Sequence, residues 1–122
     1  MSELRVLVVD DLPFMRQAIR QALQGTRFRV VAEAENGEQA IARYREIGPD
    51  VVLLDIVMPV LDGLTALRRL RRMDPDSNVI MCSALGEQAM IVRAIQLGAR
   101  DFVVKPFRPE RVVSALERVA AP

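Results

Sequence analysis

Short apolar runs alternate with stretches of helical period five times along this chain. Apolar runs of about four to eight residues between turn residues are typical of buried strands, and apolar spacings of three and four are typical of helices. The predicted strands are residues 4–9, 28–34, 51–54, 78–82 and 101–104. Residues 51–54 are apolar on both faces, which indicates a central strand, whereas residues 28–34 alternate, which indicates a strand with one wet side.

Each predicted strand is followed by residues that place an apolar stripe on one face of a helix. These stripes are Met15, Ile19, Ala22 and Leu23; Ala40, Ile41, Tyr44 and Ile47; Leu64, Leu67 and Leu70; Met90, Ile91, Ala94, Ile95 and Leu97; and Val112, Val113, Leu116 and Val119. Pro13 marks the start of the first helix, and Gly25 its end. Five such units predict an α/β fold, a doubly wound five-stranded parallel sheet with five helices.

The composition is that of an ordinary soluble protein, and the net charge limits the kinds of partner that the chain attracts. With 51% hydrophobic residues, 27% charged residues and a net charge of +1, the chain gives no general attraction to nucleic acid or membrane. Arg68, Arg69, Arg71 and Arg72 lie close together, but on the outer face of a helix, where we expect them to be solvated. The first residues lack the pattern of a signal peptide, which predicts a cytoplasmic protein.

The residues that are absent exclude several kinds of chemistry. The chain has no histidine, which excludes a Ser-His-Asp or Cys-His site, a histidine metal site and a phosphohistidine on this chain. Its one cysteine, Cys82, ends an apolar run, so we expect a buried and inert thiol rather than a redox group. A disulfide within the chain is impossible.

Polar residues stand at the ends of four predicted strands: Asp10 and Asp11, Asp55, Ser83, and Lys105. We expect the strand order 2-1-3-4-5, in which the first and third strands are neighbours and their carboxyl ends meet at one edge. Three carboxylates in a partly buried cleft require a cation, and oxygen ligands of this kind suit Mg²⁺. With Mg²⁺ and Lys105 offsetting the charge, Asp55 can attack a phosphoryl group, and Ser83 can donate to one of its oxygens.

Four motifs carry a resemblance over essentially the whole chain. VLVVDD, VVLLDIVMPVLDG, MCSALG and DFVVKPF, in this order and spacing, resemble the receiver domain of two-component response regulators, and SALGEQAM and KPFRPERV most resemble the single-domain chemotaxis regulators. The resemblance implies one receiver domain over residues 1–122. It implies that Asp55 accepts a phosphoryl group from a partner histidine kinase, with Asp10 and Asp11 as the acidic pair around Mg²⁺.

The resemblance also implies roles for residues around the acceptor. The backbone carbonyl of Val57 joins the metal ligands, Lys105 contacts the phosphoryl group, and Lys105-Pro106 is a cis peptide bond. Ser83 is the switching hydroxyl and Phe102 the switching aromatic. Such a protein is a switch and not a turnover enzyme, because its phosphoryl group shifts a population between two states.

The resemblance further implies that the fourth helix, the fifth strand and the fifth helix signal to a protein target. Chemotaxis or flagellar control is the expected setting, with a flagellar switch component or a phosphatase as partner, and without direct contact to nucleic acid or membrane. Many such regulators carry Tyr where this chain has Phe102, so the switching aromatic of this chain has no hydroxyl to offer an output partner.

Two apolar residues and one loop affect the expected behaviour of the acceptor. Val57 and Leu85 stand two positions beyond the acceptor and the switch hydroxyl, and apolar side chains there cannot orient a water. We therefore predict slow autodephosphorylation. In the loop MPVLDG, Pro59 is expected to supply rigidity and Gly63 an unusual φ.

Three other functions fit parts of the sequence. The chain could be the receiver of a larger regulator with a DNA-binding or enzymatic output domain, although it ends with LERVAAP just after the last helix. A phosphatase of the haloacid-dehalogenase type requires Asp-x-Asp, which Asp55-Ile56-Val57 lacks. A flavodoxin-like carrier shares the fold, but Asp10 and Asp11 have the wrong charge for its phosphate cradle.

Overall fold

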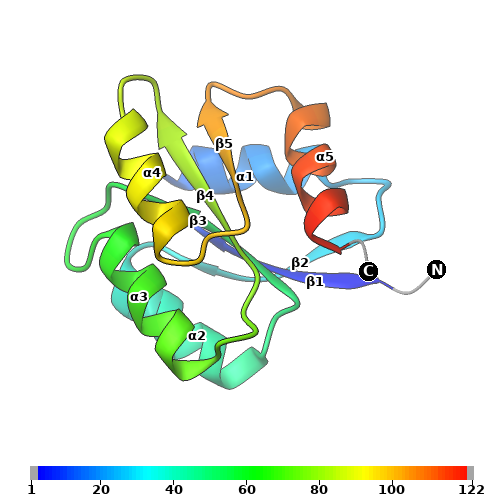
Figure 1. Ribbon diagram of the computed structural model, residues 1–122. Coiled ribbons are helices and arrows are strands. Elements are labelled where there is room, and N and C mark those ends of the chain that lie inside the picture. Colours follow the sequence, from blue (N-terminus) through cyan, green and yellow to red (C-terminus); the bar gives the residue numbers. More distant parts are fainter. Residues whose placement is uncertain (1–2, 121–122) are drawn as a thin grey trace.

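The computed structural model describes residues 3–120, in which five parallel strands lie between two layers of helices (Figure 1). The strands are β1 (Leu4–Val9), β2 (Phe28–Ala34), β3 (Val51–Asp55), β4 (Val79–Ala84) and β5 (Asp101–Lys105). Their order is β2-β1-β3-β4-β5, and each neighbouring pair is parallel. The predicted fold class and strand order are confirmed.

Five helices cover the two faces of this sheet. They are α1 (Pro13–Ala22), α2 (Gly37–Ile47), α3 (Gly63–Met73), α4 (Gln88–Gln96) and α5 (Pro109–Ala120). Helices α1 and α5 lie on one face, and α2, α3 and α4 lie on the other (Figure 1). None of the helices between residues 3 and 120 has the length and apolar character needed to cross a membrane.

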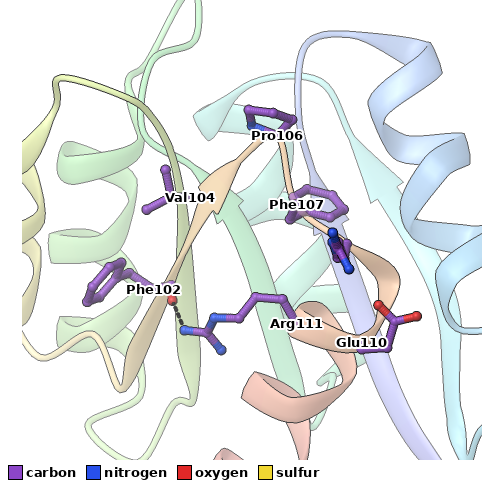
Figure 2. Close-up of a pocket in the computed structure, with 7 residues that line it drawn as sticks. Phe102, Val104, Pro106, Phe107, Glu110 and Arg111 are labelled. Carbon is purple, nitrogen blue, oxygen red and sulfur yellow. Dashed lines mark hydrogen bonds between the residues drawn. The ribbon is translucent and has the colours of Figure 1, made fainter.

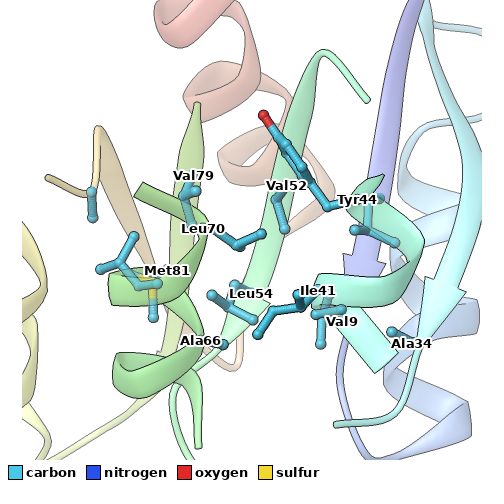
Figure 3. Close-up of a cluster of buried hydrophobic side chains, with 14 of the residues drawn as sticks. Val9, Ala34, Ile41, Tyr44, Val52, Leu54, Ala66, Leu70, Val79 and Met81 are labelled. Carbon is cyan, nitrogen blue, oxygen red and sulfur yellow. The ribbon is translucent and has the colours of Figure 1, made fainter. Parts of the chain in front are cut away.

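Two apolar layers hold the helices to the sheet. One layer joins the sheet to α2, α3 and α4, and includes Leu54, Ile41 and Leu70 (Figure 3). The other joins it to α1 and α5. All five residues of β3 are buried, as expected for a central strand, whereas β2 is an edge strand and is buried only at its two ends.

Several element ends differ from the sequence prediction. Helix α1 ends at Ala22 rather than at Gly25, because a turn with a Thr26 N–H to Leu23 carbonyl bond replaces its last residues. Strands β3, β4 and β5 continue to Asp55, Ala84 and Lys105. The parallel ladder depends on backbone groups and not on side-chain polarity. Asp55, Ser83 and Lys105 are therefore presented by strand ends, whereas Asp10 and Asp11 directly follow β1.

Candidate functional site

The three strand-end carboxylates meet at one edge of the sheet. Asp10 follows β1, Asp55 ends β3, and these strands are neighbours. Asp10, Asp11 and Asp55 each place a carboxylate oxygen within 4.8 Å of the others. Asp10 and Asp55 are buried, and Asp11 is half-buried. The structure confirms the predicted convergence.

Lys105, the only lysine of the chain, lies in this pocket. Its Nζ lies 2.7 Å from Asp10 Oδ2 and 3.3 Å from Asp55 Oδ1. Burial alone would lower the pKa of Lys105, but the hydrogen bond to Asp10 and the charge of Asp55 outweigh burial and raise it. Lys105 is therefore a fixed positive charge. The bond between Lys105 and Pro106 is cis, as the resemblance implies.

The pocket has more negative charge than Lys105 can neutralise. Burial raises the pKa of Asp55 to about 6, the Lys105 ammonium acts against this rise, and the charges of Asp10 and Asp11 add to it. Three carboxylates and one ammonium leave an excess of two negative charges when all are ionised. This charge and the all-oxygen donor set fit a divalent cation such as Mg²⁺.

Ser83 contributes a buried hydroxyl on the strand beside Asp55. It lies on β4, where the preceding residue, Cys82, is the register partner of Asp55. Among residues 3–120 its Oγ has no hydrogen-bond partner. A buried polar group without a partner costs about 1–3 kcal/mol. The hydroxyl can therefore donate to an oxygen of a ligand bound at this edge.

The loop between β3 and α3 corrects the prediction for Gly63. A positive φ of 68° occurs at Val60, where the Leu61 N–H donates to the Pro59 carbonyl at 2.7 Å, and Gly63 has no such φ. Gly63 is needed for close approach instead, because a Cβ on it would lie 2.0 Å from the Asp55 carbonyl oxygen. Val57 and Leu85 are both exposed beside this loop and β4.

The surface formed by α4, β5 and α5 adjoins the site. The Phe102 ring packs against the layer of α2, α3 and α4, and points away from Arg111, whose Nη2 donates to the Phe102 carbonyl at 2.8 Å (Figure 2). A pocket of about 650 Å³ lies between β5 and α5, lined in part by Phe107 and Arg108. On α4, Met90 and Ile95 are exposed, although their spacing predicted an inward stripe.

Two other groups of residues stay outside the site. Cys82 is buried, and burial raises the pKa of its thiol to about 12, so the thiol stays protonated at neutral pH. Arg68, Arg69 and Arg72 are exposed on α3, as expected for a solvated face. Arg71 is only half-exposed and donates to the Ser77 carbonyl at 2.8 Å.

One residue that touches the site was missed by the sequence analysis. Arg16, on α1, donates from Nη1 to the Asp10 carbonyl at 2.7 Å and from Nε to Glu33 at 2.9 Å. No motif links Arg16 to Glu33, because the two residues meet only when β2 lies beside β1. The one available signal was the helical spacing of Arg16 and Arg20, which places two guanidinium groups on one face of α1.

Comparisons with known proteins agree with this geometry. Residues 6–117 match the family described as the response regulator receiver domain. The chemotaxis protein CheY of Bacillus subtilis (strain 168) is 51% identical over 114 residues, which cover 93% of this chain and 95% of that protein. CheY of Listeria monocytogenes is 53% identical over 117 residues, covering 96% and 98%. The CheX-CheY-BeF3-Mg²⁺ complex from Borrelia burgdorferi contains a chain with a TM-score of 0.94 and 32% identity, covering 99% of this chain and 92% of that one.

Proposed function

Because the chain belongs to the response regulator receiver domain family, we propose that it is a chemotaxis-type phosphorylation switch whose acceptor is Asp55. The observation that carries the proposal is the meeting of three carboxylates, one ammonium and one hydroxyl at a single sheet edge, where residues 3–120 offer the hydroxyl no partner. The whole chain, residues 1–122, acts as one receiver domain in the cytoplasm. A receiver within a larger DNA-binding or enzymatic regulator is the alternative.

The acceptor reaction is a transfer from a phosphohistidine of a partner kinase. An oxygen of Asp55 bonds to phosphorus as the bond from phosphorus to the histidine nitrogen breaks, and that nitrogen leaves with its electron pair. Asp10, Asp11, Asp55 and the Val57 backbone carbonyl would hold Mg²⁺, which supplies positive charge against the phosphoryl oxygens. Lys105, fixed beside Asp55, contacts one of these oxygens, and the Ser83 hydroxyl donates to another.

The phosphoryl group changes the output surface through Ser83 and Phe102. When the Ser83 hydroxyl turns toward the phosphoryl group, the space beside it admits the Phe102 ring, and α4, β5 and α5 adopt the signalling arrangement. Exposed Met90, Val92 and Ile95 on α4 support a protein as the target. Partners of this kind are a flagellar switch component, a phosphatase or a protein like CheX, with which the Borrelia burgdorferi chain was crystallised.

The phosphorylated state lasts long because the acceptor has apolar neighbours. Val57 and Leu85 are exposed beside the pocket, and neither side chain can hold a water in line with the phosphorus. Hydrolysis therefore lacks an oriented nucleophile. A half-life of only seconds for phospho-Asp55 in the purified protein with Mg²⁺ would refute this part of the proposal.

Beryllofluoride, which mimics a phosphoryl group on a carboxylate, tests the switch directly. We expect ¹H–¹⁵N spectra with beryllofluoride and Mg²⁺ to shift at Ser83 and Phe102, and along α4 and α5, in the wild-type protein. The variant Asp55→Asn has no carboxylate to accept the mimic and should show no such change. A wild-type response confined to the pocket, with the α4 and α5 amides unmoved, would contradict the signalling route.

A further inference from the structure

Arg16 lies where helix electrostatics do not explain a positive charge. It is the fourth residue of α1, close to the helix N-terminus, and the first turn of this helix contains no acidic residue. A cation near a helix N-terminus is unfavourable, because that end carries partial positive charge. Its side chain is only 16% exposed. The position of Arg16 therefore requires a tertiary explanation.

The guanidinium group of Arg16 is held between β2 and the acidic site. Its Nε donates to Glu33 Oε1 at 2.9 Å, and its Nη1 donates to the Asp10 carbonyl oxygen at 2.7 Å. Partial burial favours the neutral form of Glu33, but hydrogen bonds from Arg20 and Arg16 outweigh burial and lower the pKa of Glu33. Because the guanidinium group is planar, its two contacts fix both its position and its orientation.

The contact with Arg16 completes the restraint of Asp10. The Asp10 N–H donates to the Ala34 carbonyl at 3.1 Å, and Asp10 Oδ1 accepts from the Leu12 N–H at 3.0 Å. Asp10 is 1% exposed, so its carbonyl needs a protein partner in place of water. Arg16 provides that partner where the β1 ladder has ended.

We propose that Arg16 is a positioning residue for the cation site, because it fixes the peptide that joins Asp10 to Asp11. The two carboxylates extend from the two ends of this peptide, so its orientation sets the angle at which they approach each other. Mutual repulsion would turn an unrestrained peptide and separate them. This inference rests on the proposed Mg²⁺ site and adds a residue that does not touch the metal.

Mg²⁺ affinity separates positioning from general stability. Outer contacts of a metal site typically change its affinity by about 10–100-fold, and we expect Arg16→Met to weaken Mg²⁺ binding within this range in a calorimetric titration. The matched control is Arg20→Met, because Arg20 also binds Glu33, at 2.5 Å, but forms no hydrogen bond or ion pair with Asp10. This control should stay within about twofold of wild type, since an exposed ion pair contributes little. Arg16→Lys, which keeps the charge and one donor group, should restore part of the affinity.

A metal-free signal checks the same contact. The ¹³C shift of the Asp10 carbonyl and the ¹⁵N shift of Asp11 should move in Arg16→Met without Mg²⁺ and stay in place in Arg20→Met. If Arg16→Met is too unstable to study, Glu33→Gln loosens the guanidinium with less change in volume, and should give a smaller loss of the same kind. Equal Mg²⁺ affinity in wild type, Arg16→Met and Glu33→Gln would overturn this inference alone. Absence of Mg²⁺ binding by the wild type would overturn the proposed function as well.

Discussion

The sheet has an amino edge, where the strands begin, and a carboxyl edge, where they end. Charged groups are paired differently at the two edges. At the amino edge, Arg5 Nη1 donates to the Ile47 and Gly48 carbonyls at 2.9 and 3.0 Å, and the Arg5 N–H donates to Asp50 at 2.7 Å. At the carboxyl edge, three carboxylates lie together, the Lys105 ammonium pairs with Asp10 and Asp55, and the Ser83 hydroxyl has no partner among the residues described. Arg5 and Asp50 at the amino edge are paired within the chain, whereas the carboxyl edge leaves negative charge for a ligand.

This difference shows where the molecule gives up stability for function. Arg5 and Asp50 at the amino edge close loops onto the sheet, and both find partners within the chain. The carboxyl edge holds like charges together on strand ends that cannot separate, because the ladder and the two apolar layers fix them. Proteins commonly violate rules of local consistency at functional sites. Substitutions at the two edges should therefore have unequal or opposite effects.

The largest expected effect compares glycines at the two edges. Gly63 lies beneath the end of β3, where an added Cβ would lie 2.0 Å from the Asp55 carbonyl oxygen, so Gly63→Ala should cost about 3 kcal/mol or more by overpacking. Gly48, at the amino edge, has a φ of 56° and open space around it. Gly48→Ala should cost only the backbone strain, about 1–2 kcal/mol. Urea unfolding measures both, and equal losses would contradict the close-packed role of Gly63.

The next effect compares carboxylates and should change sign between the edges. The folded protein raises the pKa of Asp55 from 3.8 to about 6, so it binds more protons than the unfolded chain between these values. Stability should therefore fall as pH rises from about 4 to about 6. Above this range Asp55 is ionised in both states, so its ionisation causes no further loss of stability. At pH 7 without Mg²⁺, the substitution Asp55→Asn should raise the free energy of unfolding by about 1–3 kcal/mol and should remove this pH dependence.

Asp50→Asn is the control for that comparison. Asp50 accepts a charge-assisted bond from the Arg5 N–H, and an amide accepts the same bond more weakly. We expect a loss of about 0.5–1 kcal/mol, opposite in sign to the gain from Asp55→Asn. Thermal unfolding at several pH values would show both. A destabilising Asp55→Asn would mean that the carboxyl edge has no excess charge.

A smaller effect concerns the lifetime of the phosphoryl group. Val57→Asn places a polar side chain beside Asp55, where it can orient a water, and should speed hydrolysis of phospho-Asp55 by about tenfold, equal to about 1.4 kcal/mol in the barrier. Val92→Asn is a matched control, because Val92 is similarly exposed but lies on α4. Loss of the phosphoryl group is followed by intact mass against time. The same rate in both variants and the wild type would exclude the role given to Val57.

The smallest effect concerns backbone strain at the carboxyl edge. Val60 has a φ of 68°, which is unfavourable for a β-branched residue, and its side chain is 79% exposed, so packing gives little in return. Val60→Gly should raise stability by about 1 kcal/mol. Val57→Gly, at an exposed valine without a positive φ, should instead lower stability by about 0.5–1 kcal/mol. Chemical unfolding of the two variants separates strain from the loss of a side chain.

The sequence predicted the elements, the strand order and the meeting of the strand-end residues. This succeeded because hydrophobic period reports burial, and because a parallel sheet brings carboxyl ends to one edge. It did not predict that Gly63 serves close approach while Val60 carries the positive φ, because a glycine in a turn motif is compatible with either role. It also missed Arg16, whose partners Asp10 and Glu33 are brought together only by the fold.

The chemical role of each site residue cannot be assigned from the hydrophobic periodicity or from the geometry of the site alone. The structure brings Asp10, Asp11, Asp55, Lys105 and Ser83 to one edge, but which carboxylate binds the metal and which accepts a phosphoryl group depends on ligands from outside the chain. Asp55 is assigned as acceptor because it lies beside both the Lys105 ammonium and the strand that carries the Ser83 hydroxyl. This assignment is the central claim of the account.

Phosphorylation by a small-molecule donor tests that claim most directly. The purified protein is incubated with acetyl phosphate, with and without Mg²⁺, and the product is analysed by intact mass and peptide mapping, with Asp55→Asn as the control. We expect one phosphoryl group to be added to Asp55, only in the presence of Mg²⁺, and none to be added to the variant. A phosphoryl group on another residue, or an unlabelled wild-type protein in the presence of Mg²⁺, would contradict it.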